Sequence, residues 1–476
     1  MNDGSPTRGG GGMGGGVKRW LRIVPGLVLV ACLCAAAPVG AADKLVWRAA
    51  ADRVDADIDG WTLPQLLERI AEATGWQVFV EPATQLRQPV SVKFNHAPVG
   101  EALGRMLGEL SFALLPQPKA PAKLFVFRTS VGDATQAVKP REVPKAKPIP
   151  DELVLLRKPG SKESAEELAK RLGARITGRL DQFGAYRLKF ADEKAAREAL
   201  AAMNGNADFD VDFSYPLPRP ATADPLAASS ALPFTLKADA SAPAGQLVVG
   251  LIDTAVQRNS PFGDLLLTGV SVAGEATPGS TGPTHGTSMF ETVLRGLAST
   301  QDKGAATSVR VLPVDVYGSA ETTSTFNVAL GIAEALNAGA SIINLSLASP
   351  GDSQLLHNVI AQGAARGVLF LGAAGNEPTT AANYPAAYPE VVAVTAGGRN
   401  GQLASYANRG DFVDVVAPGS SIIYFGGKSY LVSGTSASTA FVSGLAAGMK
   451  ARTGASAEAV AAKLKEALGA PKPGGN

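Results

Sequence analysis

The stretch Ser433–Ala440 reads Ser-Gly-Thr-Ser-Ala-Ser-Thr-Ala and directly precedes an apolar segment of helical character. Its second serine, Ser436, would lie at the start of that helix, where backbone N–H groups point outward beside the positive end of the helix dipole. Gly434 lets another chain approach closely. A hydroxyl placed there can attack a carbonyl group, and the N–H groups can hold the resulting oxyanion. Because the same residues also suit an ordinary capped helix, the decision depends on partners elsewhere in the chain.

A serine nucleophile needs a base, and the base needs a group that orients it. The chain has three histidines. His285 follows a Gly/Pro-rich loop and precedes a predicted helix over 288–297, whereas His96 falls in a polar turn and His357 on a solvated helix. We therefore predict that His285 is the base.

Asp253 is the candidate for the orienting carboxylate. It ends the nearly continuous apolar run 246–252, which is typical of a buried parallel strand. Open α/β sheets place their sites at the carboxyl ends of such strands. The order Asp253, His285, Ser436 is one of the orders known for this triad.

Asn376 completes the predicted site. It follows a second buried strand (367–371) and a loop of small residues. An Asn side-chain amide at that position can donate to a developing oxyanion, together with the backbone N–H of Ser436.

These residues, in this order, resemble the subtilases, the subtilisin-like serine peptidases. The resemblance covers 245–470 and also rests on four further segments, 338–347, 383–394, 405–410 and 414–419. It implies an α/β fold with a mostly parallel, subtilisin-like sheet and helices on both faces. It also implies peptide-bond hydrolysis by acyl transfer, with the roles given above for Asp253, His285, Ser436 and Asn376.

The resemblance further implies where a polypeptide substrate would bind in an extended conformation. Two segments would pair with it as edge strands, namely Gly318, Ser319 and Ala320 on one side and Ser346, Leu347 and Ala348 on the other. The pocket for the residue before the cleaved bond would be walled by Ala373, Ala374 and Gly375. In this mode of binding, the enzyme contacts the substrate mainly through backbone hydrogen bonds and less through the substrate's side chains.

The chain departs from the family pattern at Ala255, Phe290, Glu291, Ala348 and Ala440. A buried Glu291 would be costly unless paired or protonated. We expect a helix that exposes it; the alternative is a carboxylate that reaches the substrate cleft. These departures leave open a second function, a catalytically weak or inactive subtilase-fold binding protein of the cell envelope.

The first 42 residues have a basic start, an apolar centre and a small-residue exit, which predict a secretory signal peptide. A membrane anchor is the alternative, and the surroundings of Cys32 also resemble a lipoprotein processing box. Cleavage would remove both cysteines, Cys32 and Cys34, and change the formal net charge from +2 to −1. The mature chain would be exported, periplasmic or extracellular, without disulfides and without the basic surplus typical of nucleic-acid binding.

Residues 43–130 are predicted to form a small α+β domain. Thr62 can cap a helix that Gly75 ends. The strands predicted by alternation are 76–80, 90–94 and 123–127, and a second helix is expected over 103–110. The pattern resembles the short N-terminal domain of secretins and TonB-dependent receptors and implies docking to an envelope protein; a spacer domain is the alternative. A Pro/Lys-rich linker is expected over 131–150.

Residues 151–215 are predicted to be β-α-β-β-α-β, the ferredoxin-like order. The expected elements are Glu152–Arg157, 162–172, 174–180, 184–190, 192–203 and 208–213. Before a subtilase domain this resembles an inhibitory propeptide; an independent domain is the alternative. Residues 216–244 are expected to form a disordered activation linker that is cut by the enzyme itself, and 471–476 a flexible tail. No cofactor is required, and although structural calcium is possible, no acidic cluster supports a metal site.

Overall fold

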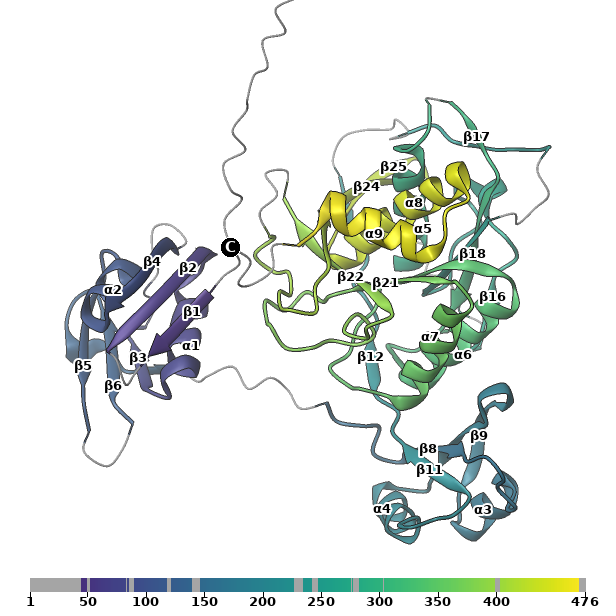
Figure 1. Cartoon of the computed structure of the whole chain (residues 1–476), viewed down its shortest axis with the longest axis horizontal. Coiled ribbons are helices and arrows are strands. Elements are labelled where there is room, and N and C mark those ends of the chain that lie inside the picture. The colour runs from purple at the N-terminus through teal and green to yellow at the C-terminus, as the bar shows by residue number, and fades with distance from the viewer. Residues whose placement is uncertain are drawn as a thin grey trace, which may run out of the picture. The chain divides into compact units, whose positions relative to one another are not determined.

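The computed structural model describes residues 44–470 except for 49–51, 83, 85–89, 118–120, 139–145, 227–233, 242–246, 275, 277–281, 303 and 399–402 (Figure 1). The predicted signal peptide, with Cys32 and Cys34, and the predicted tail 471–476 lie outside the described residues. Among the helices of the described chain, none combines the length and apolarity needed to cross a membrane.

The first domain contains two small sheets and two helices. Thr62 caps α1 through a capping box, and Gly75, with φ +69°, ends it as predicted. The sheet orders are β1-β2-β4 and β5-β6-β3-β7. Because β7 pairs with β3, this domain extends to Val138, beyond the expected boundary at 130. The elements are β1 Lys44–Arg48, β2 Arg53–Trp61, α1 Leu63–Thr74, β3 Gln77–Val80, β4 Val90–Pro98, α2 Val99–Leu107, β5 Ser111–Leu115, β6 Lys123–Phe127, η2 Val131–Asp133 and β7 Gln136–Val138.

The second domain has the predicted β-α-β-β-α-β order. Its antiparallel sheet runs β11-β8-β10-β9, so the fourth strand lies beside the first, as in ferredoxin-like folds. The elements are β8 Glu152–Arg157, α3 Ala165–Arg171, β9 Arg175–Leu180, η3 Asp181–Phe183, β10 Ala185–Lys189, α4 Glu193–Ala202 and β11 Phe209–Asp212.

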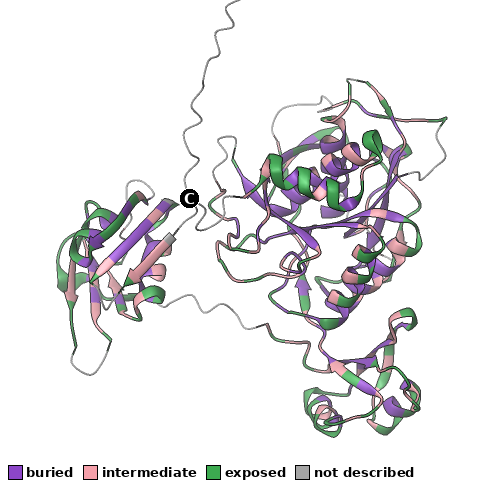
Figure 2. Ribbon diagram, in the orientation of Figure 1, coloured by how far each residue is buried: buried purple, intermediate pink, exposed green. Residues whose placement is uncertain are grey.

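The third domain is built on a seven-stranded, fully parallel sheet within the described chain, in the order β16-β18-β15-β20-β21-β22-β23. The central strands are buried on both faces (Figure 2), which explains why their sequences are continuous apolar runs. The strands are β15 Leu247–Asp253, β16 Val270–Ser271, β18 Val309–Asp315, β20 Ala340–Leu345, β21 Leu369–Ala373, β22 Val391–Gly397 and β23 Val415–Pro418.

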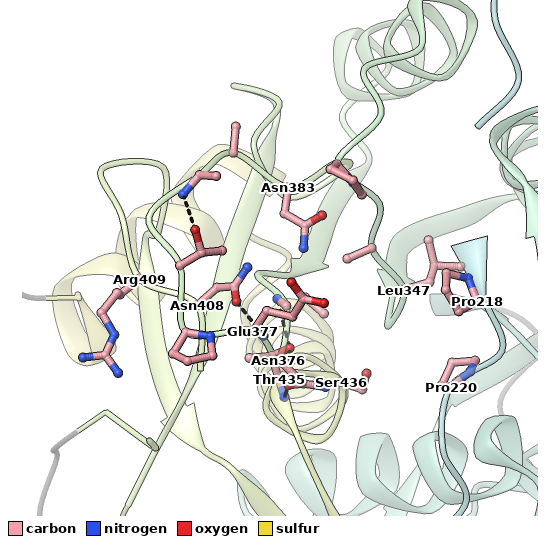
Figure 3. Close-up of a pocket in the computed structure, with 18 of the residues that line it drawn as sticks. Pro218, Pro220, Leu347, Asn376, Glu377, Asn383, Asn408, Arg409, Thr435 and Ser436 are labelled. Atoms are coloured by element: carbon pink, nitrogen blue, oxygen red, sulfur yellow. Dashed lines mark hydrogen bonds between the residues drawn. The ribbon is translucent and has the colours of Figure 1, made fainter. Parts of the chain in front are cut away.

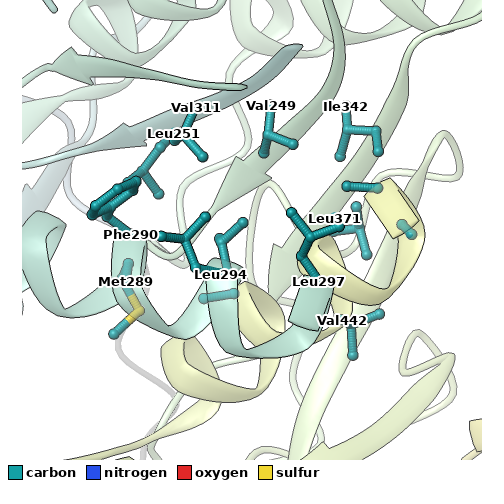
Figure 4. Packing of buried hydrophobic residues seen from close by; sticks show 14 of the residues in the cluster. Val249, Leu251, Met289, Phe290, Leu294, Leu297, Val311, Ile342, Leu371 and Val442 are labelled. Atoms are coloured by element: carbon teal, nitrogen blue, oxygen red, sulfur yellow. The ribbon is translucent and has the colours of Figure 1, made fainter. Parts of the chain in front are cut away.

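Helices cover both faces of this sheet, as predicted (Figure 1). One face packs against α5 (His285–Ala298), α8 (Thr435–Thr453) and α9 (Ala457–Leu468). The other packs against α6 (Thr325–Asn337) and α7 (Gln354–Ala365). Figure 4 shows Leu294 and Leu297 of α5 facing the side chains of the strands.

Two glycines let α5 and α8 touch. A Cβ atom at Gly296 would collide with the carbonyl oxygen of Phe441, and one at Gly444 with that of Val293. Only glycine fits at such a crossing. The crossing matters because α5 begins at His285 and α8 begins one residue before Ser436, so it holds two predicted site residues in one rigid pair of helices.

The expected disorder of 216–244 is wrong for much of the segment. Three short strands pair there with edges of the third domain, β12 with β19, β13 with β25 and β14 with β17. Proline lacks an N–H group but fits an edge strand, so Pro216, Pro218 and Pro225 are tolerated. The remaining elements are β12 Pro216–Pro218, β13 Asp224–Pro225, β14 Lys237–Ala238, η4 Gly263–Leu265, β17 Ala306–Thr307, β19 Thr322–Ser324, β24 Ser420–Phe425 and β25 Lys428–Ser433.

Candidate active site

Asp253 and His285, which are 32 residues apart, form a buried pair at the carboxyl edge of the sheet. Asp253 is 1% exposed at the end of β15, and His285 is 4% exposed at the start of α5. The Nδ1 atom of His285 lies 2.8 and 2.9 Å from the two carboxylate oxygens of Asp253. This contact orients the ring and leaves its Nε2 atom on the side away from Asp253.

The start of α5 is tied to the strand that carries Asp253. Thr284 caps the helix by accepting the N–H of Thr287. The N–H of Gly286 donates to the hydroxyl of Thr254 at 2.8 Å, and a Cβ at Gly286 would collide with the Thr254 carbonyl oxygen. Gly286 is therefore needed for the close approach of α5 to β15.

Ser436 lies in the first turn of α8 and is 8% exposed. Its hydroxyl donates to the carbonyl oxygen of Ser346 at 3.1 Å, and its own carbonyl accepts the Ser346 hydroxyl at 3.1 Å. In the described structure the Ser436 hydroxyl thus makes its hydrogen bond with Ser346 and not with His285.

Asn376 is held beside the start of α8. Its Oδ1 atom accepts the N–H of Thr435 at 2.8 Å and the Thr435 hydroxyl at 3.1 Å. A Cβ atom at Gly434, where φ is +136°, would lie 3.1 Å from the Nδ2 atom of Asn376. Glycine at 434 therefore gives the Asn376 amide room next to Ser436.

A pocket opens beside Ser436. In Figure 3, Pro218, Pro220 and Leu347 lie on one side of it and Asn376 and Thr435 on the other, with Ser436 between them. Its lining includes the predicted Ser346, Leu347, Ala348, Ala373, Gly375 and Asn376. Ala374 is fully buried, with its carbonyl accepting the Asn383 amide. Gly318, Ser319 and Ala320 follow β18, and the carbonyls of Gly318 and Ala320 accept from Arg219.

Sequence reasoning did not single out Thr435 and Asn408, which shape the pocket. The Thr435 hydroxyl accepts the N–H of Gly375 at 3.1 Å. Asn408 accepts the N–H of Glu377 at 2.8 Å through its side chain. Two features of the sequence could have indicated these residues. Thr435 precedes the proposed nucleophile directly, and Asn408 lies within segment 405–410, which resembles the subtilases. His96 and His357 lie elsewhere, near Asp55 and Glu390 respectively.

Glu291 is fully buried, so the expected exposure of this residue is wrong. Its carboxylate does not reach the pocket either. One oxygen accepts the backbone N–H of Tyr424 at 2.7 Å, and the other lies 3.1 Å from the Ser260 hydroxyl. Glu291 thereby joins α5 to β24 and to the loop before η4. Phe290 and Ala440 are buried in the same core.

Because the Glu291 carboxyl is buried, we expect it to make the stability of the folded protein depend on pH. Burial is the main cause that raises its pKa from 4.5 to about 7, opposed by the two hydrogen bonds and the charge of Arg295. Between these values the folded chain binds the proton more tightly than the unfolded chain does. The contribution of Glu291 to the free energy of unfolding should therefore fall as pH rises from 4.5 to 7, by about 3 kcal/mol, and level off above.

Glu291→Gln mimics the protonated carboxyl and should remove this fall. Relative to the parent, we expect a melting temperature that is similar at pH 4.5 and higher at pH 8, measured by calorimetry in a Ser436→Ala background to prevent self-digestion. The exposed Glu466 provides the control substitution Glu466→Gln. An equal effect of Glu291→Gln at both pH values would contradict the assignment.

Comparison with known proteins agrees with the fold and the arrangement of the site. The model of the subtilase family of peptidases matches residues 245–470. Thermitase from Thermoactinomyces vulgaris is 35% identical over 230 residues, which are 46% of this chain and 79% of thermitase. The chain belongs to the subtilase family. The predicted subtilisin-like fold is thereby confirmed.

Two further subtilases illustrate the extent of the similarity. Subtilisin Savinase from Lederbergia lenta is 34% identical over 206 residues, 42% of this chain and 75% of the relative. A thermostable alkaline protease from Halalkalibacterium halodurans is 37% identical over 170 residues, 35% of this chain and 47% of the relative. This chain thus spans about half the length of the latter protein.

A second family model, the fervidolysin N-terminal prodomain, matches residues 134–214. The predicted propeptide-like region is therefore confirmed, and its match begins before the expected boundary at 151. The resemblance of 43–130 to secretin and TonB-dependent receptor domains stays a prediction.

Proposed function

We propose that this subtilase is a serine endopeptidase, made as a precursor and exported to the periplasm or the extracellular space. The observation that carries the proposal is the buried His285 ring, held by both oxygens of Asp253 at the sheet edge where α8 presents Ser436. A buried, carboxylate-bound imidazole and a serine at a helix start are the parts that an acyl-transfer site needs.

The proposed mechanism uses only side chains and amides of the chain. His285 accepts the proton of Ser436 as the serine attacks a peptide carbonyl, and Asp253 holds the tautomer and stabilises the imidazolium. The Asn376 amide and the Ser436 N–H hold the oxyanion. His285 then protonates the leaving amine, and water repeats the steps. The Ser436 hydroxyl must first turn from Ser346 towards His285, a change between staggered rotamers.

The prodomain is proposed to act as an inhibitory propeptide, and its contacts with the catalytic domain support this. Asp212 caps α7, accepting the Ser353 hydroxyl at 2.9 Å and the Leu355 N–H at 2.8 Å. A carboxylate at a helix start is stabilised by the free N–H groups and the dipole. Arg187 donates to Asn327 of α6 at 3.0 Å. The prodomain therefore docks on the start of both helices.

The segment after the prodomain predicts where the precursor is cut. β12 pairs with β19 as far as Pro218, Pro220 lines the pocket beside Ser436, and pairing resumes at Asp224 with β25. The chain therefore passes the proposed nucleophile between Pro220 and Asp224. We expect a mature N-terminus within 221–224, read by N-terminal sequencing of the processed protein. A start beyond Leu226 would contradict this path.

A fluorophosphonate probe, which reacts only with activated serines, tests the proposed activity. The processed protein should be labelled, and peptide mapping should place the label on Ser436. The rival function, a subtilase-fold binding protein, is favoured by the hydrogen bond that turns the Ser436 hydroxyl towards Ser346. Absence of label on processed protein would support that rival.

The oxyanion role of Asn376 makes a separate prediction. Asn376→Leu should lower kcat by about 10²- to 10³-fold and change KM little, because the lost donor acts mainly in the transition state. The control is Thr435→Val, which removes the hydroxyl bond to Asn376 but no oxyanion donor, and should cost much less. Equal losses in steady-state peptide hydrolysis would assign Asn376 a structural role instead.

Export and the envelope partner remain proposals from sequence. Export rests on the signal-like segment 1–42, with a lipid anchor at Cys32 as a minor alternative, and docking to an envelope protein rests on the pattern of 43–130. The proposed chemistry needs no cofactor. Among the described residues, no group of three or more His, Cys, Asp or Glu side chains could hold a metal ion.

A further inference from the structure

The side chain of Arg219 is held by the catalytic domain beside the pocket. Its Nε atom donates to the Ala320 carbonyl at 2.9 Å and its Nη2 atom to the Gly318 carbonyl at 2.7 Å. The guanidinium also lies over the ring of Tyr317, 5.4 Å from its centroid. These contacts use the planar fork of arginine, because two nitrogens reach two separate carbonyls while the flat face meets an aromatic ring.

The turn that supplies these carbonyls also has hydrogen bonds of its own within the catalytic domain. Asp315, at the end of β18, accepts the N–H groups of Tyr317 at 2.9 Å and Gly318 at 3.0 Å through Oδ1. Gly318 has φ +57°, a left-handed conformation that favours glycine. The N–H of Ala320 donates to the Tyr317 carbonyl. The residues that form the turn therefore all belong to the catalytic domain.

The surroundings of this turn favour a cation. The second carboxylate oxygen of Asp315 is buried and has no hydrogen-bond partner within the described residues. Burial raises the pKa of Asp315, and the nearby Arg219 charge opposes that rise. Asp253 is the direct neighbour of Asp315 on the adjacent strand and adds negative charge. The Arg219 side chain thus contacts carbonyl oxygens and an aromatic face, with the buried Asp315 carboxylate close enough to act on its charge.

The main chain around Arg219 is held as a bound peptide would be. Its N–H donates to the Glu321 carbonyl at 2.8 Å, and the preceding Pro218 carbonyl accepts the Tyr317 hydroxyl at 3.1 Å. Backbone bonds of this kind set the register of an extended peptide, and a pocket then selects one side chain.

We propose that the turn 315–320, with the ring of Tyr317, is a subsite for an arginine side chain of the substrate, and that Arg219 is its first occupant. This inference rests on the proposed peptidase function. The path of the chain past Ser436 puts this arginine two to five residues before the cleaved bond. The preferred substrates are therefore extended peptides with arginine at that position.

Matched peptides test the preference. Internally quenched peptides with the sequence 217–226 are compared with versions carrying Arg219→Ala, Arg219→Lys or citrulline, using processed enzyme. We expect kcat/KM to fall about 10- to 100-fold for Ala and citrulline and less for Lys, because charge-assisted, two-pronged contacts are lost. The ratio of kcat/KM for the arginine peptide to that for the alanine peptide should fall as the salt concentration rises, because salt screens the charge of the arginine. Equal kcat/KM for all peptides would overturn the inference and leave the peptidase function standing.

Enzyme variants assign the preference to this turn. Tyr317→Leu removes the ring and should lower the Arg/Ala ratio of kcat/KM, whereas Tyr317→Phe keeps the ring and should preserve most of it. An unchanged ratio in Tyr317→Leu would place the selection elsewhere and overturn the assignment.

A measurement without hydrolysis separates the two proposals. In the full chain carrying Ser436→Ala, hydrogen exchange of the amides of Leu217, Arg219 and β19 reports on the docked segment. Adding Arg219→Gln should speed the exchange of these amides at least severalfold. The control is Arg179→Gln, which breaks an ion pair with Glu166 inside the prodomain and should leave their exchange unchanged. Unchanged exchange in Arg219→Gln would overturn the subsite. If the processed protein is neither labelled by the fluorophosphonate probe nor able to hydrolyse peptides, the peptidase proposal is refuted. The exchange measurement still shows whether the turn 315–320 binds the arginine side chain, because it needs no hydrolysis.

Discussion

Ser436→Ala is expected to lower the rate of peptide hydrolysis by about 10⁵- to 10⁶-fold and to leave the precursor uncut. The reason is geometric as well as chemical. Pro220 lines the same pocket as Ser436, and the pairing of β12 and β13 on either side of it keeps the precursor chain beside that residue. Without the hydroxyl, neither an added peptide nor the chain's own segment can form an acyl-enzyme.

Intact-mass analysis and hydrolysis of a quenched peptide measure this result. Ser438→Ala is the matched control, because Ser438 is buried two residues away and its hydroxyl donates to the carbonyls of Ala417 and Pro418. We expect that control to be processed and active, with at most a modest loss of stability. A processed Ser436→Ala protein with parental activity would disprove the proposed nucleophile.

Asp253→Asn has the next largest expected effect, a fall in kcat of about 10⁴-fold with little change in KM. Both carboxylate oxygens of Asp253 lie within 2.9 Å of Nδ1 of His285, so the carboxylate keeps the proton on Nδ1 and leaves Nε2 free to accept one. An Asn amide can donate to Nδ1 and stabilise the opposite tautomer, in which Nε2 already carries a proton.

Steady-state kinetics at pH 7 to 10 check this expectation, and Asp264→Asn, at an exposed position, is the control. Circular dichroism and thermal melting should show that both variants fold, because the Thr254 N–H that donates to Asp253 at 2.7 Å can also donate to the Asn oxygen. A fall of less than tenfold in Asp253→Asn would mean that Asp253 does not set the tautomer of His285.

Much of the fold could be predicted because its information is local. Continuous apolar runs marked β15 and β21, since strands buried on both faces need apolar side chains at every position. The β-α-β-β-α-β order of 151–215 followed from alternation and helix periodicity, and β8 has the predicted bounds. Predicted and observed ends differ elsewhere, as at α5, which begins at His285 and not at Ser288. Caps such as Thr284 act through side-chain geometry that periodicity does not reveal.

Non-local pairing explains what was missed. The segment 216–244 was predicted to be disordered because its Pro/Ala/Ser composition cannot build a core. In the structure, β12 and β13 pair with edge strands about 100 and 200 residues further along the chain. Glu291 looked misplaced on a core-facing helix because its partners, Ser260 and the Tyr424 amide, lie on segments 31 residues before it and 133 residues after it.

The amino-acid sequence alone determined the family, the order of the elements and the candidate residues, because motifs and periodicity are properties of short segments. Only the tertiary structure decided which groups meet: the Asp253–His285 pair, the Ser436 hydroxyl on Ser346, the hydrogen bonds of Glu291 and the carbonyls around Arg219. The physical reason is that parallel strands bring their carboxyl ends together regardless of separation along the chain, and the contacts made there depend on distances that no local pattern contains.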